Sequence, residues 1–414
     1  MLPGTVMHQP AARLVDSKSS WVVATVGVVL LGTAFGAPWM AAVALKDIAA
    51  EAGGTRSVPA LATALAWFGA AFGGIGMGWI AERVGVRWTV IFGSLMMALG
   101  LAIATLGPSW PLYLGYGVFV GLIGLSGINA PLFVYVSKWF ERRRGSAFAF
   151  ISSGTYIAGA LWPPIFERAI AYVGWRQTML WFAVLEAGII VPLAAVFLRR
   201  APQLLPVSVT HRAAPEPATV LGWPPNLVFA ALCAAIFMCC VPMAMPQSHL
   251  VAFCSDLGIS KAHGAAMLSV LLGTAFLCRQ IWGLIADRIG GLHTALLGSA
   301  IQVMTMSAFL FTQDEVGLFT VAAAFGVGFS GMIPATVLAG RQLFPPAEAS
   351  WRIPTLLLCS GCGMATGGWL AGILYDHFGY YGPAFATGIV VNLLNFAVLL
   401  MLVGRRHLVA ARAY

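Results

Sequence analysis

The feature that most constrains this chain is a succession of apolar runs, each about as long as a membrane-spanning helix. A helix needs about 20 mainly apolar residues to cross the hydrocarbon core of a bilayer. Twelve such runs lie at residues 21–45, 57–81, 89–107, 111–137, 145–166, 175–198, 227–252, 264–286, 293–312, 316–340, 353–375 and 381–403. The first is too long for the core of a signal peptide. The sequence therefore predicts an all-α membrane protein with twelve transmembrane helices.

The chain carries too little charge for a water-soluble protein. Its residues are 60% hydrophobic and only 9% Asp, Glu, Lys or Arg, whereas an ordinary soluble domain has about 25% charged residues. The net charge of +9 could suggest nucleic-acid binding, but the basic residues stand singly or in short groups between apolar runs. Nucleic-acid binding needs them clustered on an exposed face. We therefore expect a lipid bilayer as the surroundings and no nucleic-acid partner.

The basic residues predict the orientation of the chain, because cytoplasmic loops of membrane proteins are enriched in Lys and Arg. With the N-terminus placed in the cytoplasm, the cytoplasmic segments hold 17 of the 23 Lys and Arg, the external segments hold 5, and one lies within a run. We expect a multi-pass protein of the cell (inner) membrane with both termini in the cytoplasm.

A long proline-rich break divides the chain into two halves. Residues 199–226 contain six prolines, a composition typical of a flexible or polyproline-like linker. The expected organisation is a cytoplasmic tail (1–20), an N-terminal six-helix bundle (21–198), a cytoplasmic linker (199–226), a C-terminal six-helix bundle (227–403) and a cytoplasmic tail (404–414).

An internal repeat supports this division. GWIAERVG (78–85) follows the second run, and GLIADRIG (283–290) follows the eighth, 205 residues later. The same offset relates Gly174, before the sixth run, to Gly379, before the twelfth. Matches at one offset and at equivalent points predict a duplicated six-helix unit, and hence two pseudo-symmetric bundles.

The paired octapeptides are candidates for a gate at the cytoplasmic face. Their first glycine would let a neighbouring helix approach closely, their acidic residue would bond a helix terminus or an Arg, and their last glycine would let the chain turn sharply. The alternative is that the arginines only extend toward lipid headgroups. The predicted gating residues are Gly78, Glu82, Arg83, Gly85, Gly283, Asp287, Arg288 and Gly290, together with Arg142, Arg143 and Arg144 between the fourth and fifth runs.

With twelve runs, a central linker and two GxxxDRxG-like sequences, the chain resembles the major facilitator superfamily over nearly its whole length after about residue 20. Glu82 in place of Asp departs from the motif. The resemblance implies a transporter in which two six-helix bundles rock about a central substrate site.

Three segments carry a finer resemblance. WFERRRGSAFAFISSG (139–154), HLVAFCSDLGIS (249–260) and RQIWGLIAD (279–287) are similar to sequences of the monocarboxylate transporters and the related oxalate/formate exchangers. However, Trp39 stands where animal proton-coupled members have Lys, Ala275 stands where they have Asp, and the eleventh run lacks the second cation of the oxalate exchangers. Neither coupling scheme fits, and a single cation suits a monoanion better than a dianion.

Arg279 is the main candidate for the substrate site. Apart from Glu186 it is the only formal charge well inside a run, and a charge in hydrocarbon is costly enough to indicate function. It lies eight residues before Asp287, hence roughly 12 Å from the cytoplasmic end and near the middle of a core of about 30 Å. Its planar guanidinium matches a carboxylate in a bidentate pair. The alternative is a structural Arg paired with Glu186 or with backbone carbonyls.

Further polar residues of the runs are candidates for substrate binding or coupling. Asn129 and Tyr156 could hydrogen-bond the far end of a substrate held by Arg279, with helix packing as the alternative. His249, the only histidine well inside a run, could bind substrate, line an outer gate or titrate during transport, or be structural. Glu186 could couple transport to an ion, but the resemblance places its span among the outer supports, where a protonated or packed carboxyl is the alternative.

The sequence thus predicts a secondary active or facilitative transporter that moves a small organic anion, in particular a monocarboxylate, by rocker-switch alternating access. It should function as a monomer, with protons or a counter-anion as the possible driving ions. The alternatives are efflux of an amphipathic compound, with Trp39, Trp67 and Trp162 forming the pocket, and a non-transporting nutrient sensor. We expect that the protein is not an enzyme and that it binds no cofactor or metal, because the runs hold no paired acid and base groups or metal ligands. Cysteines inside apolar runs give no reason to expect a disulfide.

Overall fold

The computed structural model describes residues 16–140, 144–198, 219–345 and 348–411, and these residues are helical apart from turns and one isolated β-bridge between Val220 and Trp223. Eleven helices in this part of the chain are long and apolar enough to cross a membrane. One of them, α8 (Arg144–Phe197), is two helices joined at Gly174, where φ is 78° and ψ is 165°. Counting α8 as two spans gives twelve, so the predicted all-α membrane fold is confirmed.

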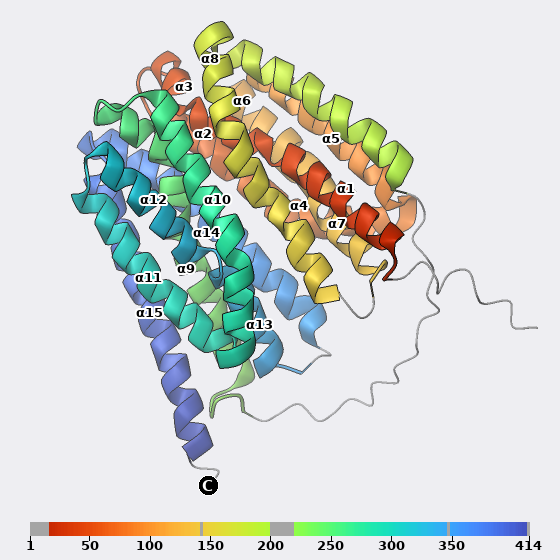
Figure 1. Cartoon of the computed structure of the whole chain (residues 1–414), viewed down its shortest axis with the longest axis vertical. Coiled ribbons are helices and arrows are strands. Elements are labelled where there is room, and N and C mark those ends of the chain that lie inside the picture. Colours follow the sequence, from red (N-terminus) through yellow and green to blue (C-terminus); the bar gives the residue numbers. More distant parts are fainter. Residues whose placement is uncertain (1–15, 141–143, 199–218, 346–347, 412–414) are drawn as a thin grey trace, which may run out of the picture.

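The helices form two bundles, drawn from red to yellow and from green to blue in Figure 1. The N-terminal bundle contains α1 (Lys18–Ala34), α2 (Gly36–Val43), α3 (Leu45–Glu51), α4 (Ser57–Val84), α5 (Val86–Ala104), α6 (Trp110–Leu114), the π-helix η1 (Gly115–Leu125), α7 (Ser126–Ser137) and α8. The C-terminal bundle contains α9 (Pro225–Asp256), α10 (Lys261–Ile289), α11 (Gly291–Phe311), α12 (Glu315–Phe329), α13 (Met332–Leu343), α14 (Ala349–Phe378) and α15 (Gly382–Ala411).

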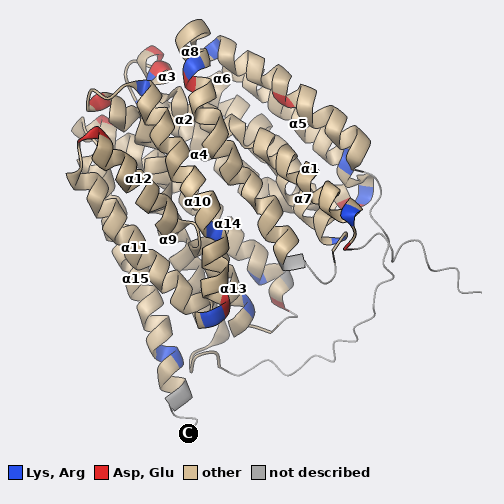
Figure 2. Cartoon of the chain, in the orientation of Figure 1, with Lys and Arg blue, Asp and Glu red and all other residues tan. Residues whose placement is uncertain are grey.

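The two ends of the molecule differ in the segments that they carry. We call the end at which α1 begins and α15 ends the terminal end, and the end that carries α3 the distal end (Figure 1). Charged residues gather at both ends, and the middle of the bundles is largely free of them (Figure 2). This distribution is expected of a protein whose middle lies in hydrocarbon.

The backbone repeats at the offset seen in the sequence. Left-handed φ values between 76° and 98° occur in three glycine pairs, each 205 residues apart: Gly53 and Gly258, Gly85 and Gly290, and Gly174 and Gly379. Glycine adopts this conformation without the steric cost that a side chain would add. Since the members of each pair end or begin equivalent helices, the two bundles have the predicted pseudo-symmetry.

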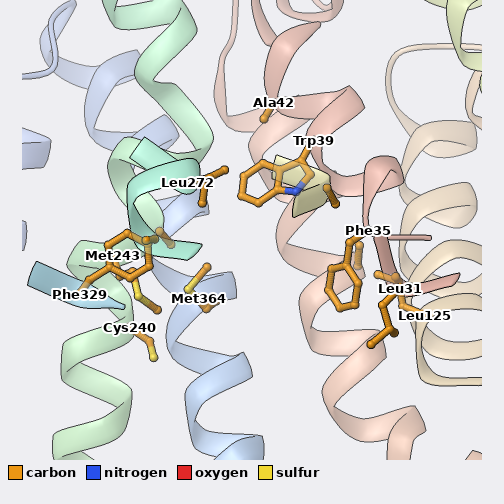
Figure 3. Packing of buried hydrophobic residues seen from close by; sticks show 14 of the residues in the cluster. Leu31, Phe35, Trp39, Ala42, Leu125, Cys240, Met243, Leu272, Phe329 and Met364 are labelled. Atoms are coloured by element: carbon orange, nitrogen blue, oxygen red, sulfur yellow. The ribbon is translucent and has the colours of Figure 1, made fainter. Parts of the chain in front are cut away.

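The bundles meet where α4 packs against α14 and where α8 packs against α10. At Gly372 of α14, a Cβ atom would lie 2.9 Å from the Cβ of Ala60 on α4. At Gly159 of α8, a Cβ atom would lie 2.2 Å from Leu272 Cδ1 and 3.1 Å from Trp39 Cε2, and Figure 3 shows these last two side chains next to each other. The close contacts between helices at this interface therefore depend on glycines, which have no side chain to keep the helices apart.

Candidate functional site

Arg279 and Tyr156 face each other across the bundle interface. Arg279 is half-buried in α10, eighteen residues after Lys261 and ten before Ile289. Its Cζ lies 5.0 Å from the centre of the Tyr156 ring, which belongs to α8 of the other bundle. A cation above an aromatic face is attracted by about 0.5–2 kcal/mol. The structure thus brings together two residues that the sequence assigned to one site.

The guanidinium of Arg279 forms no ion pair with an acidic residue among the described residues. Its contact there is with the ring of Tyr156. Glu186 is fully buried, and neither of its carboxyl oxygens has a hydrogen-bond partner there. Among the described residues, Arg279 is thus paired neither with Glu186 nor with a backbone carbonyl, and its role stays a prediction. The five N–H donors of the Arg279 guanidinium form no hydrogen bond with a described residue, so they are available to a ligand.

Two aromatic residues extend the surroundings of this pair. The Phe329 ring, at the end of α12, lies 6.2 Å from that of Tyr156. Trp39 of α2 lies beside Leu272, two turns from Arg279 along α10 toward the distal end. Trp39 is 5% exposed, and its indole N–H has no acceptor among the described residues. An unsatisfied buried donor costs about 1–3 kcal/mol, so this N–H is a further group that a polar ligand could satisfy.

Asn129 and Glu186 are not brought to the Arg279 pair. Asn129 is half-buried in α7, and its amide forms no hydrogen bond with another described residue. Glu186 lies in the second part of α8 near Ser94 of α5, whose hydroxyl also lacks a partner there. The roles predicted for these two residues stay predictions.

The strongest polar contacts between the bundles lie at the distal end. The Arg56 guanidinium donates two hydrogen bonds of 2.6 Å to the Asp256 carboxylate and one of 2.8 Å to the Tyr381 hydroxyl. Lys46 donates to the same carboxylate at 3.0 Å. Asp376 accepts the backbone N–H of Arg56 at 2.7 Å. These bonds connect the beginning of α4 with the ends of α9 and α14.

A second ion pair crosses the interface beside the first, with Lys261 Nζ 2.7 Å from Asp47 Oδ1. Arg56 and Lys261 are 205 residues apart, so equivalent positions of the two repeats each reach across to the other bundle. We call the set the distal gate, and it comprises Lys46, Asp47, Arg56, Asp256, Lys261, Asp376 and Tyr381. The sequence did not lead us to the distal gate, because the charged residues of the loops served only to predict the orientation of the chain in the membrane. The repeat offset was the signal that could have found it.

The protonation states of the distal gate follow from its contacts. Burial by itself would lower the pKa of Arg56, but its bonds to Asp256 and Tyr381 raise it above the usual value, so the guanidinium is charged. Burial raises the pKa of Tyr381, so its hydroxyl keeps its hydrogen. Tyr381 can therefore accept from Arg56 and donate elsewhere.

His249 is the next group along this chain of hydrogen bonds. It is fully buried in α9, with Nδ1 3.0 Å from Tyr381 Oη and Nε2 2.8 Å from the Gly368 carbonyl oxygen. His249 thus lies behind the distal gate and does not contact Arg279. Of its predicted roles, the position next to an outer gate agrees best with this geometry.

Among the described residues, the motif residues of the predicted gate at the terminal end form no hydrogen bond or ion pair between the bundles. A Cβ atom added at Gly78 or Gly283 would meet nothing within 4 Å, so the close helix contact expected at these glycines is absent. Glu82 and Asp287 are exposed. Between pairs of described residues, every hydrogen bond and ion pair that joins the two bundles lies at the distal end.

The remaining gating candidates show three different situations. Gly85 and Gly290 have φ values of 98° and 83° and end their helices, as a sharp turn requires. Arg83 lies over the Trp79 ring at 3.5 Å, and Arg288 is exposed. Arg142, Arg143 and the side chain of Arg144 lie outside the described residues. The gating role of all these residues stays a prediction.

A sequence model of the Major Facilitator Superfamily matches residues 24–253 of this chain. Among curated proteins, the chain is 22% identical over 325 residues to an agnestins efflux protein of Paecilomyces divaricatus, covering 78% of this chain and 73% of that protein. It is 23% identical over 334 residues to monocarboxylate transporter 13 of Rattus norvegicus, covering 78% of this chain and 74% of that protein.

Solved structures with a similar fold include a mutant of the peptide transporter POT, with a TM-score of 0.74 and 14% identity over 97% of this chain and 99% of that one. A D-xylose-proton symporter has a TM-score of 0.70 and 16% identity over 92% of this chain and 96% of that one. At such identities the likeness establishes the fold alone.

Proposed function

Because this chain belongs to the major facilitator superfamily and is a multi-pass membrane transporter, we propose that it moves a small organic anion, in particular a monocarboxylate, with Arg279 as the anion anchor. The observation that carries the proposal is an arginine near the middle of a span whose donors have no partner among the described residues. It faces Tyr156 of the other bundle at 5.0 Å.

The chemistry of the pair suits a monoanion. A guanidinium binds a carboxylate through two parallel N–H···O bonds, and Tyr156 supplies a hydroxyl and a ring face from the opposite bundle. A single cation neutralises a single negative charge, and burying a second, unpaired carboxylate would be costly. Because Arg279 and Tyr156 come from different bundles, a substrate between them would contact both moving parts.

We propose that transport follows a rocker-switch cycle, of which this structure represents the state closed at the distal end. The terminal end, with both chain termini, would face the cytoplasm of a cell (inner) membrane protein that works as a monomer. The motif residues Glu82 and Asp287 and the basic residues near Arg144 would close that end in the opposite state. The ion pairs at the distal end support this proposal, since alternating access requires one end of the carrier to be closed while the other is open.

Binding and uptake of lactate and pyruvate test the anion assignment. Thermal unfolding of the purified protein with each acid would report binding, and proteoliposomes would report uptake. Arg279→Ala removes charge-assisted hydrogen bonds worth about 2–4 kcal/mol in sum, which corresponds to an increase in Kd on the order of 30- to 1,000-fold. Arg279→Lys keeps the charge but loses the bidentate geometry, so uptake should also fall strongly.

Arg341→Ala is the matched control, because Arg341 is exposed near the terminal end of α13. It should bind and transport as the unmodified protein does. Normal uptake by a folded Arg279→Ala variant would overturn the anion assignment.

The likeness to an efflux protein favours one alternative, export of an amphipathic compound through the aromatic residues Trp39, Trp67 and Trp162. Trp162 is engaged within its own bundle, where its indole N–H donates to the Gly32 carbonyl at 2.7 Å. Competition separates the two functions, since short carboxylates should inhibit anion uptake but not export of an amphipathic compound. Binding without any flux would instead indicate a sensor.

A further inference from the structure

We propose that His249 is a proton-binding site that controls the distal gate. The neutral ring holds the gate closed through Tyr381, and the protonated ring releases it. The inference rests on the proposed transport cycle and deepens it by naming the ion that biases closure of the distal end.

Only one neutral form of the His249 ring fits its neighbours. A carbonyl oxygen can only accept a hydrogen bond, so Nε2, at 2.8 Å from the Gly368 oxygen, carries the hydrogen. In the neutral ring Nδ1 is then bare and accepts from the Tyr381 hydroxyl at 3.0 Å. The lone pairs of that hydroxyl are left for Arg56, whose Nη1 donates at 2.8 Å.

The result is one directed chain of hydrogen bonds that ends in the gate. Arg56 donates to Asp256 and to Tyr381, Tyr381 donates to His249, and His249 donates to Gly368. Arg56, Tyr381 and His249 are 6%, 2% and 0% exposed. Buried chains of this kind are stabilising only while every donor has its acceptor.

Protonation of His249 breaks this chain at its centre. A proton from water on the distal side forms an N–H bond at Nδ1, and no other covalent bond changes. The Tyr381 hydroxyl then loses its acceptor, while the ring and Arg56 both direct N–H groups at the same oxygen. The ring also becomes a second buried cation beside the guanidinium, which disfavours the closed gate.

Among the described residues, no carboxylate contacts the His249 ring, whose two nitrogens are bonded to Tyr381 and Gly368. At the distal end, the titratable and charged groups on or next to the elements around α9 include Asp256 on α9, Tyr375, Asp376 and His377 on α14, Lys46, Asp47 and Glu51 on α3, Lys261 and His263 on α10, Arg56 before α4 and Tyr381 before α15. Asp256 is bound by Arg56 and Lys46, and Asp376 accepts two backbone N–H groups. The proton is therefore bound in the open state, where water reaches the ring.

This linkage sets the direction and the size of the effect. Since the open state binds the proton and the closed state does not, acid favours opening. Below about pH 6.5, where a hydrated imidazole takes up a proton, each further pH unit should raise the open-to-closed ratio by up to about tenfold. Above about pH 7.5 the ratio should no longer change.

Distances between two spin labels on the distal surface test the proposal in proteoliposomes without any substrate. The labels are attached through p-acetylphenylalanine at the exposed positions Thr55 and Gln313, one in each bundle, which leaves the native cysteines intact. Between pH 8 and pH 5 the fraction of long distances should rise in the otherwise unmodified protein. In His249→Gln that fraction should be independent of pH, and in Tyr381→Phe it should be high throughout.

The matched control is His263→Gln, which removes an exposed distal histidine that pairs with Glu315 at 2.8 Å. Its pH response should equal that of the unmodified protein. A pH response that survives in folded His249→Gln, one that disappears in His263→Gln, or none in the unmodified protein would overturn the proposal. Because no substrate is present, such a result leaves the anion assignment standing, and a failure of Arg279 to bind anions leaves this measurement unaffected.

Discussion

Replacing Asp256 by Asn should shift the protein toward a state that is open at the distal end. Arg56 makes two bonds of 2.6 Å to the Asp256 carboxylate, and the side chains are 7% and 25% exposed. The variant would leave the Arg56 charge without its carboxylate in the closed state. Opening lets water hydrate that charge, so the loss falls mainly on the closed state.

The size of the shift follows from the burial of the pair. Removing one partner of a buried ion pair costs about 3–5 kcal/mol. The partial exposure of Asp256 and the retained bond from Arg56 to Tyr381 reduce this to about 2–3 kcal/mol. At about 1.4 kcal/mol per factor of ten, the closed-to-open ratio should fall roughly 30- to 150-fold.

Asp47→Asn is the matched control, because Asp47 forms the neighbouring ion pair with Lys261 but the two side chains are 30% and 40% exposed. An exposed pair contributes at most about 1 kcal/mol, so this variant should shift the ratio by no more than roughly fivefold.

The spin labels at Thr55 and Gln313 measure both variants at pH 8, and thermal unfolding confirms that each is folded. The reasoning is refuted if folded Asp256→Asn keeps the original distance distribution, or if Asp47→Asn shifts it as far. Equal shifts would mean that burial of the Arg56 pair does not decide how firmly the distal end is closed.

Two further predictions concern carboxylates outside the proposed transport path. Glu186→Gln should leave Tm and lactate uptake unchanged or raise Tm, because the amide is nearly isosteric with the carboxyl, and a buried carboxylate without a hydrogen-bond partner among the described residues is costly. Loss of uptake would show that Glu186 couples transport. The hydrogen bond from Arg176 holds the pKa of Glu51 below its usual value of 4.5. The folded-state pKa is thus the lower one, so the pair stabilises the fold above the unfolded-state pKa, and this contribution disappears as the pH falls through the folded-state pKa. Glu51→Gln should lower the free energy of unfolding at pH 6 by less than about 1 kcal/mol, with a slightly lower Tm, and the effect should be smaller at pH 3. An equal effect at both pH values would contradict this assignment.

The number and length of the helices could be predicted from the sequence, because the thickness of the bilayer sets how many apolar residues a span needs. The repeat at 205 residues likewise predicted where the backbone turns, since Gly85 and Gly290 adopt the same left-handed conformation. The depth of Arg279 could also be predicted, because the rise per residue of a helix is constant. These properties belong to single helices or to local backbone conformation.

Which residues of the two bundles meet was decided only by the tertiary structure. In a soluble helix an apolar stripe marks the buried face, but in a membrane the lipid and the protein core are both apolar, so the runs carry little information on which side of each helix faces its partner. Sequence reasoning could propose Tyr156 for the Arg279 site without establishing that the two meet, and it missed Arg56 and Asp256, which are 200 residues apart. The rotation and docking of the helices placed these charges together, and therefore decided at which end ion pairs join the two bundles.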